Sequence, residues 1–136
     1  MIERNKMIDG KETDEDFVSA FLRFLKELFK KLWPSCTFEE FLEEIGEYFD
    51  GIMRQEESKN KGKKCPGGKI TFTLTGDKVE IEAKLYFFDS ETEKWTVRTS
   101  RNTVDKSRFN DWDKDEDLQR LSRGETVELD IKAPSE

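Results

Sequence analysis

The chain has 136 residues, and its 31 acidic against 24 basic side chains give it a net charge of −7. That length suits a single domain, and the acidic balance disfavours DNA, RNA and anionic membranes as main partners, because these are bound through cationic surface. The sequence has no histidine, which excludes Ser-His-Asp and Cys-His catalysis and an ordinary structural zinc site.

Residues 1–12 are polar and are expected to be frayed, whereas residues 13–33 are expected to form a helix. Thr13 is a suitable N-cap, with Asp16 completing an imperfect capping box. Apolar residues recur at spacings of three and four, which is the helical period. The main members of this stripe are Phe17, Phe21, Phe24, Leu28 and Leu32. Pro34 then ends the helix.

A second helix is expected up to about Arg54. Thr37 and Glu40 have the spacing of a capping box. The apolar face consists of Phe41, Leu42, Ile45, Tyr48, Phe49 and Ile52. Because the connection is short, residues 13–54 should form a closely packed helical pair.

Residues 55–69, "QEESKNKGKKCPGGK", break the helical period and carry five basic and two acidic side chains. This composition predicts a basic, flexible linker. The segment is not a phosphate-binding loop, because five residues rather than four separate Gly62 from the Gly68-Lys69 pair and no Ser or Thr follows. No cofactor is expected.

Residues 70–136 switch to a period of two. Strands are expected around Ile70–Leu74 and Val79–Phe88, with a tight turn at Gly76-Asp77 between them. A third strand should turn Trp95 and Val97 inward. A short helix near residues 115–123, ended by Gly124, and a last strand with Val127, Leu129 and Ile131 inward complete the chain.

The element order α-α-β-β-β-α-β predicts an α+β fold. One face of all four strands is apolar and the other is mostly polar, a pattern typical of an antiparallel sheet with helices on one side. We therefore expect the two N-terminal helices to pack on one face of a four-stranded, mainly antiparallel sheet within a single domain.

The stretch "DWDKDED", residues 111–117, resembles a calcium loop in its carboxylate density alone. Counted from Asp111, the glycine position is Glu116 and the bidentate glutamate position is Ser122, so the two most constrained positions fail. We expect no metal here. The stretch is better explained as a helix start, with Asp113 as the cap, Trp112 as a staple against the sheet edge, and the acids that follow on the positive end of the helix dipole.

The second helix carries an acidic ladder: Glu39, Glu43 and Glu47 are stacked four residues apart without an interleaved lysine. Such like-charge neighbours each destabilise a helix by roughly 0.2–0.5 kcal/mol, so the ladder indicates a cationic partner or mimicry of a phosphate backbone, with a merely solvated helix face as the alternative. The predicted binding face contains Glu39, Glu40, Glu43, Glu44, Glu47 and Asp50, together with Asp113, Asp115, Glu116 and Asp117.

These features predict a small, acidic, non-enzymatic protein-binding module of the inhibitor, immunity, phage host-takeover or adaptor type that engages a basic protein surface. A viral or bacterial accessory protein would fit this description. No apolar run is long enough to span a membrane and residues 1–16 lack the apolar region of a signal peptide, so a cytoplasmic location is expected. Cys36 and Cys65 are expected as free thiols, with a single bridge between them left open.

Two alternatives remain. The first is a nucleic-acid or nucleotide binder, which the overall charge disfavours, using basic and aromatic side chains on the linker and the outer sheet face. Its candidate residues are Lys61, Lys63, Lys64, Lys69, Tyr86 and Phe88, with Arg98 beside the two aromatics. The second is a homo-oligomeric structural protein assembled through a sheet edge or exposed aromatics.

Overall fold

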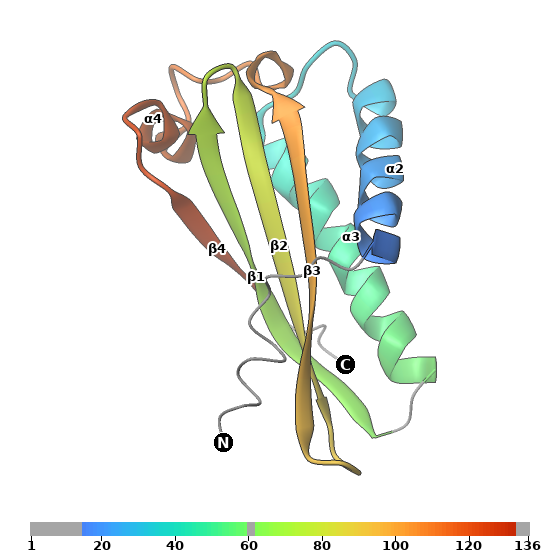
Figure 1. Cartoon of the computed structure of the whole chain (residues 1–136). Helices are drawn as coiled ribbons and strands as arrows, with labels where there is room; N and C mark the ends of the chain where they lie inside the picture. Colours follow the sequence, from blue (N-terminus) through green and yellow to red (C-terminus); the bar gives the residue numbers. More distant parts are fainter. Residues whose placement is uncertain (1–14, 60–61, 133–136) are drawn as a thin grey trace.

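The computed structural model describes residues 15–59 and 62–132. Its element order is α-α-β-β-β-α-β, with a one-turn 3-10 helix before the last α-helix. Helices lie against one face of a four-stranded antiparallel sheet, so the predicted α+β fold is confirmed (Figure 1). Thr13, the expected cap of the first helix, lies outside the described residues.

The two long helices are held together by aromatic rings. Helix α2 spans Glu15–Lys31 and helix α3 spans Phe38–Lys59. The rings of Phe24 and Tyr48 stack with their centroids 4.2 Å apart, and those of Phe21 and Phe49 lie 5.3 Å apart. The alternation of three and four residues in both sequences brings these rings onto the facing sides of the two helices.

The first turn of α3 is capped as its sequence predicts. The Thr37 hydroxyl accepts a hydrogen bond from the Glu40 backbone N–H at 3.1 Å, and the Glu40 carboxylate accepts one from the Thr37 N–H at 2.9 Å. This is the reciprocal capping box, in which two otherwise unpaired N–H groups are satisfied. The prediction of a box at this position is confirmed.

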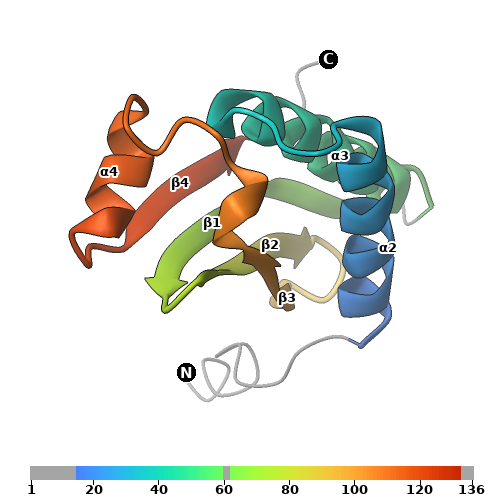
Figure 2. The same ribbon diagram turned by 90° about the horizontal axis from the view of Figure 1, so that it is seen from above.

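The sheet consists of β1 (Lys63–Thr75), β2 (Lys78–Asp89), β3 (Lys94–Asp105) and β4 (Val127–Lys132). The strand order is β3-β2-β1-β4 and every neighbouring pair is antiparallel. Helix α2 contacts β3 and helix α3 contacts β1. The short helix α4 (Glu116–Ser122) sits beside the start of β4, on the opposite side of the fold from α2 (Figure 2).

The core lies between the sheet and the helix pair and is dominated by phenylalanine. Phe38 and Phe41 of α3 pack edge-on against Phe72 of β1 and Phe109, with centroid distances from 5.0 to 6.4 Å. Burying rings of this size supplies much apolar area from few residues. A polar chain of modest hydrophobic content can therefore still form a dense core.

The prediction of a flexible linker over residues 55–69 is wrong for the residues that the structure describes there. Helix α3 continues to Lys59, and β1 begins at Lys63 and pairs with the end of β2 through a register shift. The buried residue Cys65 donates its N–H to the Glu57 carboxylate at 2.8 Å, and the Gly62 carbonyl accepts from the Ser90 N–H at 2.9 Å. These contacts between distant residues outweigh the linker-like composition.

The predicted orientation of β3 is also wrong. Trp95 and Val97 pair with Phe88 and Tyr86 on the outer face of the sheet, and Trp95 is exposed. The face toward the helices instead carries Arg98, Ser100 and Asn102. These polar groups are tolerated there because each has partners: Arg98 lies 3.5 Å from Glu56 and over the ring of Phe17, and the Ser100 hydroxyl donates to Asn102 at 2.6 Å.

Candidate functional site

The acidic ladder predicted on the second helix is present on the surface of α3. Glu39, Glu43 and Glu47 are all exposed and follow one another at the spacing of a single helix face. Within residues 15–59 and 62–132, none of the three forms an ion pair. We call these three residues the acidic stripe.

Other acids of the predicted face have structural partners. Glu44 pairs with Lys31 of α2 at 3.2 Å, and Asp50 pairs with Arg54 one turn later at 3.0 Å. Glu40 belongs to the capping box. These residues contribute negative charge near the stripe, but their contacts within the chain account for them without a partner.

An apolar groove of about 490 Å³ runs beside the stripe, between α3 and β4. Leu42, Ile45 and Phe49 line it from α3, and Leu129 and Ile131 line it from β4. A neighbouring hollow on α3 is lined by Glu43, Glu47 and Asp50 and shares Leu42 and Gly46 with the groove. The apolar groove and the acidic stripe are therefore adjacent surfaces of one helix.

Gly46 stands between the groove and the stripe. Apart from the helix's own backbone, no described heavy atom lies within 4 Å of the position that a Cβ would take there. Glycine inside a helix is roughly 0.5–1 kcal/mol less favourable than alanine, and nothing in the described chain requires it at this position. Its effect is to leave the surface open where the groove meets the stripe.

Strand β4 forms an edge of the sheet. It pairs with β1 on one side, and no described strand pairs with its other side. Val127 at the start of the strand lies near α4 and is buried. Leu129 and Ile131 lie further along the strand and are only partly buried. A sheet edge with partly exposed apolar residues is a surface on which an extended segment of another chain can pair as an additional strand.

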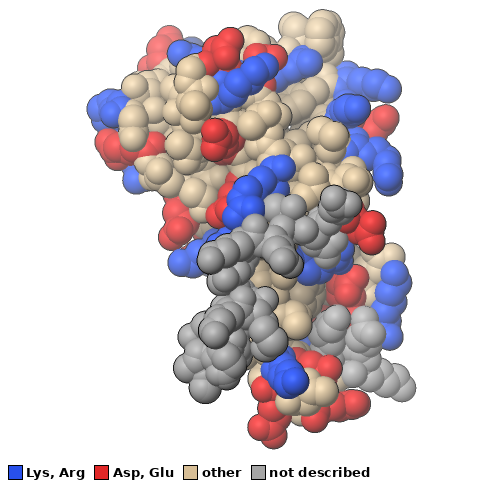
Figure 3. Space-filling view, viewed as in Figure 1, with Lys and Arg blue, Asp and Glu red and all other residues tan. Residues whose placement is uncertain are grey.

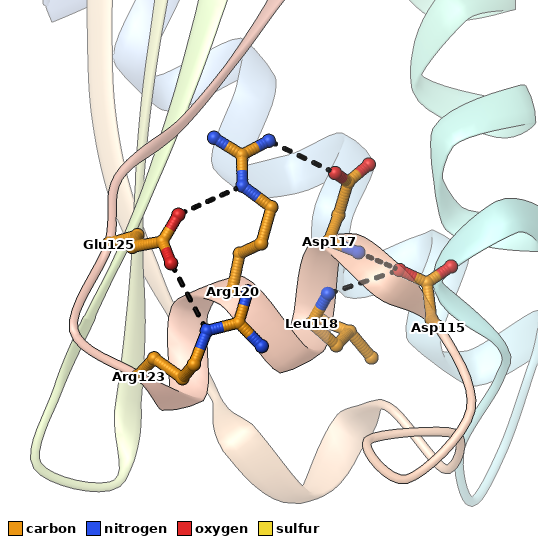
Figure 4. Close-up of polar contacts among 6 residues, drawn as sticks. All are labelled: Asp115, Asp117, Leu118, Arg120, Arg123 and Glu125. Carbon is orange, nitrogen blue, oxygen red and sulfur yellow. Dashed lines mark hydrogen bonds and ion pairs between the residues drawn. The ribbon is translucent and has the colours of Figure 1, made fainter.

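The acids of residues 111–117 serve mainly to begin helix α4 (Figure 4). The N-cap is Asp115 and not Asp113 as predicted: its Oδ1 accepts the N–H groups of Asp117 at 2.9 Å and Leu118 at 3.1 Å. The reason is that the helix begins at Glu116, one residue later than predicted, while Asp113 is left exposed. Gly124 follows the helix with a φ of 86°, as expected for a residue that ends one.

Salt bridges then stabilise the end of α4. Arg120 pairs with Asp117 at 3.6 Å and with Glu125 at 3.1 Å, and Arg123 also pairs with Glu125 at 3.1 Å. The two arginines lower the pKa of the Glu125 carboxyl through their hydrogen bonds. Of the four acids predicted here for a binding face, Asp115 and Asp117 have structural roles, whereas Asp113 and Glu116 are exposed.

The tryptophan of this segment packs inward. Its Nε1 donates to the Lys106 carbonyl at 2.9 Å, and its ring lies beside Phe109 and under the Lys106 ammonium. Lys106 opens the 3-10 helix η1, Lys106–Arg108. Trp112 thus fastens the segment before α4 to the core.

The residues of the nucleic-acid alternative do not form one cationic surface. Lys61 lies outside the described residues, Lys63 begins β1, and Lys64 is exposed. Lys69 pairs with Glu128 at 3.4 Å. Tyr86 and Phe88 are half-buried on the outer face, where Phe88 contacts Trp95 at 5.1 Å. Arg98, expected beside them, lies on the opposite face.

The two cysteines are buried and form no disulfide. Burial is the main cause that raises the pKa of the Cys36 thiol from 9.0 to about 11, and it raises that of Cys65 likewise to about 11. Both side chains are therefore uncharged thiols at neutral pH, packed as small apolar groups.

The groove itself was missed by the sequence reasoning, which assigned Leu42, Leu129 and Ile131 to the core. The one local signal was Gly46, an unexplained glycine in the middle of a strong helix.

Among the described residues there is no cluster of three or more acidic or cysteine side chains placed to hold a metal, and no helix long and apolar enough to cross a membrane. Comparison with protein-family models, curated proteins and solved structures finds no significant match.

Proposed function

We propose that the chain is a small, non-enzymatic protein-binding module that engages a basic, amphipathic segment of a partner protein through α3. The observation that carries this proposal is the adjacency of the apolar groove and the acidic stripe on one helix, with Gly46 between them. An inhibitor, immunity or adaptor protein, or a phage host-takeover factor, would act in this way.

The two surfaces have different tasks in such a complex. Apolar side chains of the partner fill the groove between Phe49 and Ile131 and supply most of the affinity, as buried apolar contacts do at interfaces. Lysine or arginine side chains of the partner lie over Glu43 and Glu47, where they guide the encounter and fix the register. An extended partner segment also has the free edge of β4 within reach for main-chain hydrogen bonds.

The experiment is affinity capture from nuclease-treated lysate at about 50 mM and 500 mM salt, a range over which charge screening changes strongly. The test variant is Glu43→Lys/Glu47→Lys, and the matched control is Glu80→Lys/Glu91→Lys, which changes the net charge equally at two other exposed positions. We expect one protein that is captured at low salt by the native chain and the control but not by the test variant. Equal capture by both variants would contradict the proposal.

A further inference from the structure

A second groove, of about 470 Å³, lies on the other side of the molecule between α2 and the end of β3. Its floor is apolar and consists of Leu25, Phe29 and Val104, all of them buried. Two of its lining residues are large hydrophobics left in solvent: Leu22 is 40% exposed and Trp33 is 68% exposed. Exposed apolar surface at a groove marks a site of interaction.

The charge of this groove is opposite to that of the chain. Five cationic and two acidic residues line it, a net of +3 in a chain of −7; they are Arg23, Lys26, Lys30, Lys78 and Arg108 against Glu27 and Asp105. Figure 3 shows Lys and Arg side chains gathered along the α2 side of the molecule. Both acids are already paired, with Lys30 at 3.6 Å and Lys78 at 3.1 Å. In the described part of the chain, Arg23, Lys26 and Arg108 have no acidic partner.

Arg108 is held in position by two rings. Its guanidinium carbon lies 4.9 Å from the Trp33 ring centroid and 5.2 Å from that of Phe29. Stacking on aromatic faces leaves the edge of a guanidinium, which carries its N–H donors, free to bind a carboxylate in two places at once. An arginine fixed beside an exposed tryptophan therefore provides an acid-binding group and an apolar contact at the same end of the groove.

We propose that this groove binds an acidic, amphipathic helix of a partner protein. Arg23 and Lys26 come from α2 and Arg108 comes from η1, so carboxylates of a docked helix find unpaired cations on both elements that border the groove. From Leu22 to Lys30 the groove follows about 12 Å of α2, long enough for two turns of a bound helix. The apolar side chains of the bound helix, spaced three or four residues apart, pack against the apolar floor of the groove.

A polyphosphate fits this groove less well than such a helix. Glu27 and Asp105 pair with Lys30 and Lys78, so only three of the five cations in the groove are left for a ligand, which is few for a polyphosphate. The floor of Leu25, Phe29 and Val104 offers nothing to phosphate but buries aliphatic side chains. Taken with the acidic α3 surface, the cationic groove gives the chain two docking faces of opposite charge, as a protein that bridges two partners requires.

The test uses the full chain and a fluorescein-labelled synthetic peptide that places leucine at every third and fourth position and aspartate or glutamate elsewhere. A scrambled peptide of the same composition is the control ligand. Binding is measured by fluorescence anisotropy. We expect saturable binding that Arg23→Glu/Lys26→Glu weakens about tenfold or more, since charge reversal replaces attraction by repulsion at both positions.

The matched control is Lys94→Glu/Lys114→Glu, which changes the net charge equally at exposed residues outside the groove and should leave affinity unchanged. Trp33→Ala removes an exposed side chain and should also weaken binding. The variant Glu43→Lys/Glu47→Lys should bind the acidic peptide as tightly as the native chain does. This result would separate the present proposal from the proposal for the α3 surface. The proposal is overturned if the peptide does not bind, if the scrambled peptide binds equally, or if a single-stranded oligonucleotide binds more tightly.

Discussion

The Oδ1 atom of Asp111 lies 3.1 Å from the backbone nitrogen of Phe38 and accepts its hydrogen bond, joining two residues that are 73 positions apart. Phe38 is the first residue of α3, so its N–H has no partner within the helix. The carboxylate of the acidic segment therefore completes the N-terminal cap that Thr37 and Glu40 begin. It also couples the start of α3 to the segment that leads into α4.

Asp111→Ala should destabilise the protein by about 1 kcal/mol, because the Phe38 N–H loses its acceptor and the dipole of α3 loses a negative charge. Asp111→Asn keeps an acceptor and should cost less. Asp113→Ala, in an exposed residue of the same segment, is the matched control and should have little effect. Urea unfolding followed by circular dichroism measures the differences. Equal losses for Asp111→Ala and Asp113→Ala would show that the hydrogen bond contributes nothing.

Gly46 and Gly51 form a matched pair in α3, since neither has a described heavy atom within 4 Å of its Cβ position apart from the helix backbone. Alanine at either position should raise the free energy of unfolding by roughly 0.5–1 kcal/mol. The two sites should differ in binding. Gly46→Gln places a long side chain where the groove meets the acidic stripe and should abolish capture of the basic partner, whereas Gly51→Gln should not. Loss of capture in both variants would remove Gly46 from the site.

Much of the fold follows from local patterns in the sequence. The box formed by Thr37 and Glu40, the helical stripe of phenylalanines and the alternation along β2 are each decided by residues close together in the chain. Those predictions are confirmed. The acidic stripe belongs to the same class, because three glutamates at a spacing of four lie on one face of any helix.

The errors occur where distant residues decide the outcome. The inward face of β3 carries Arg98, which the alternation of hydrophobic residues assigned to the outer face; its position is set by Glu56 and Phe17, neither of which is near it in the sequence. The supposed linker is ordered by Glu57 and Cys65. Both grooves were missed for the same reason, because each forms between a helix and a strand whose separation no local pattern reveals.

Gly68 should be among the least replaceable residues of the sheet. A Cβ at this position would overlap the backbone carbonyl of Lys84 on β2 and press on the Leu85 side chain. Backbone atoms in a paired strand cannot move aside without breaking ladder hydrogen bonds, so Gly68→Ala should destabilise the protein by about 2 kcal/mol or more. The control is Thr73→Ala on the same strand, where a side chain already has room. A Gly68→Ala variant as stable as the native protein would contradict the close approach of β1 to β2.

The buried thiols predict a loss of stability at alkaline pH. The folded pKa of Cys36 and of Cys65 is raised to about 11 from 9.0, so the unfolded state loses these protons first. The contribution of the two thiols to the free energy of unfolding is therefore complete below pH 9 and is lost as the pH rises through 11. Between pH 9 and pH 11 each thiol should lower the free energy of unfolding by on the order of 1 kcal/mol per pH unit. Chemical denaturation between pH 8 and about pH 10.5 measures the slope. A Cys36→Ala/Cys65→Ala variant has a lower starting stability because two buried side chains are shortened, but its decline should be shallower. A decline as steep as that of the native protein would assign the alkaline loss to other groups, such as Tyr48, whose pKa burial also raises.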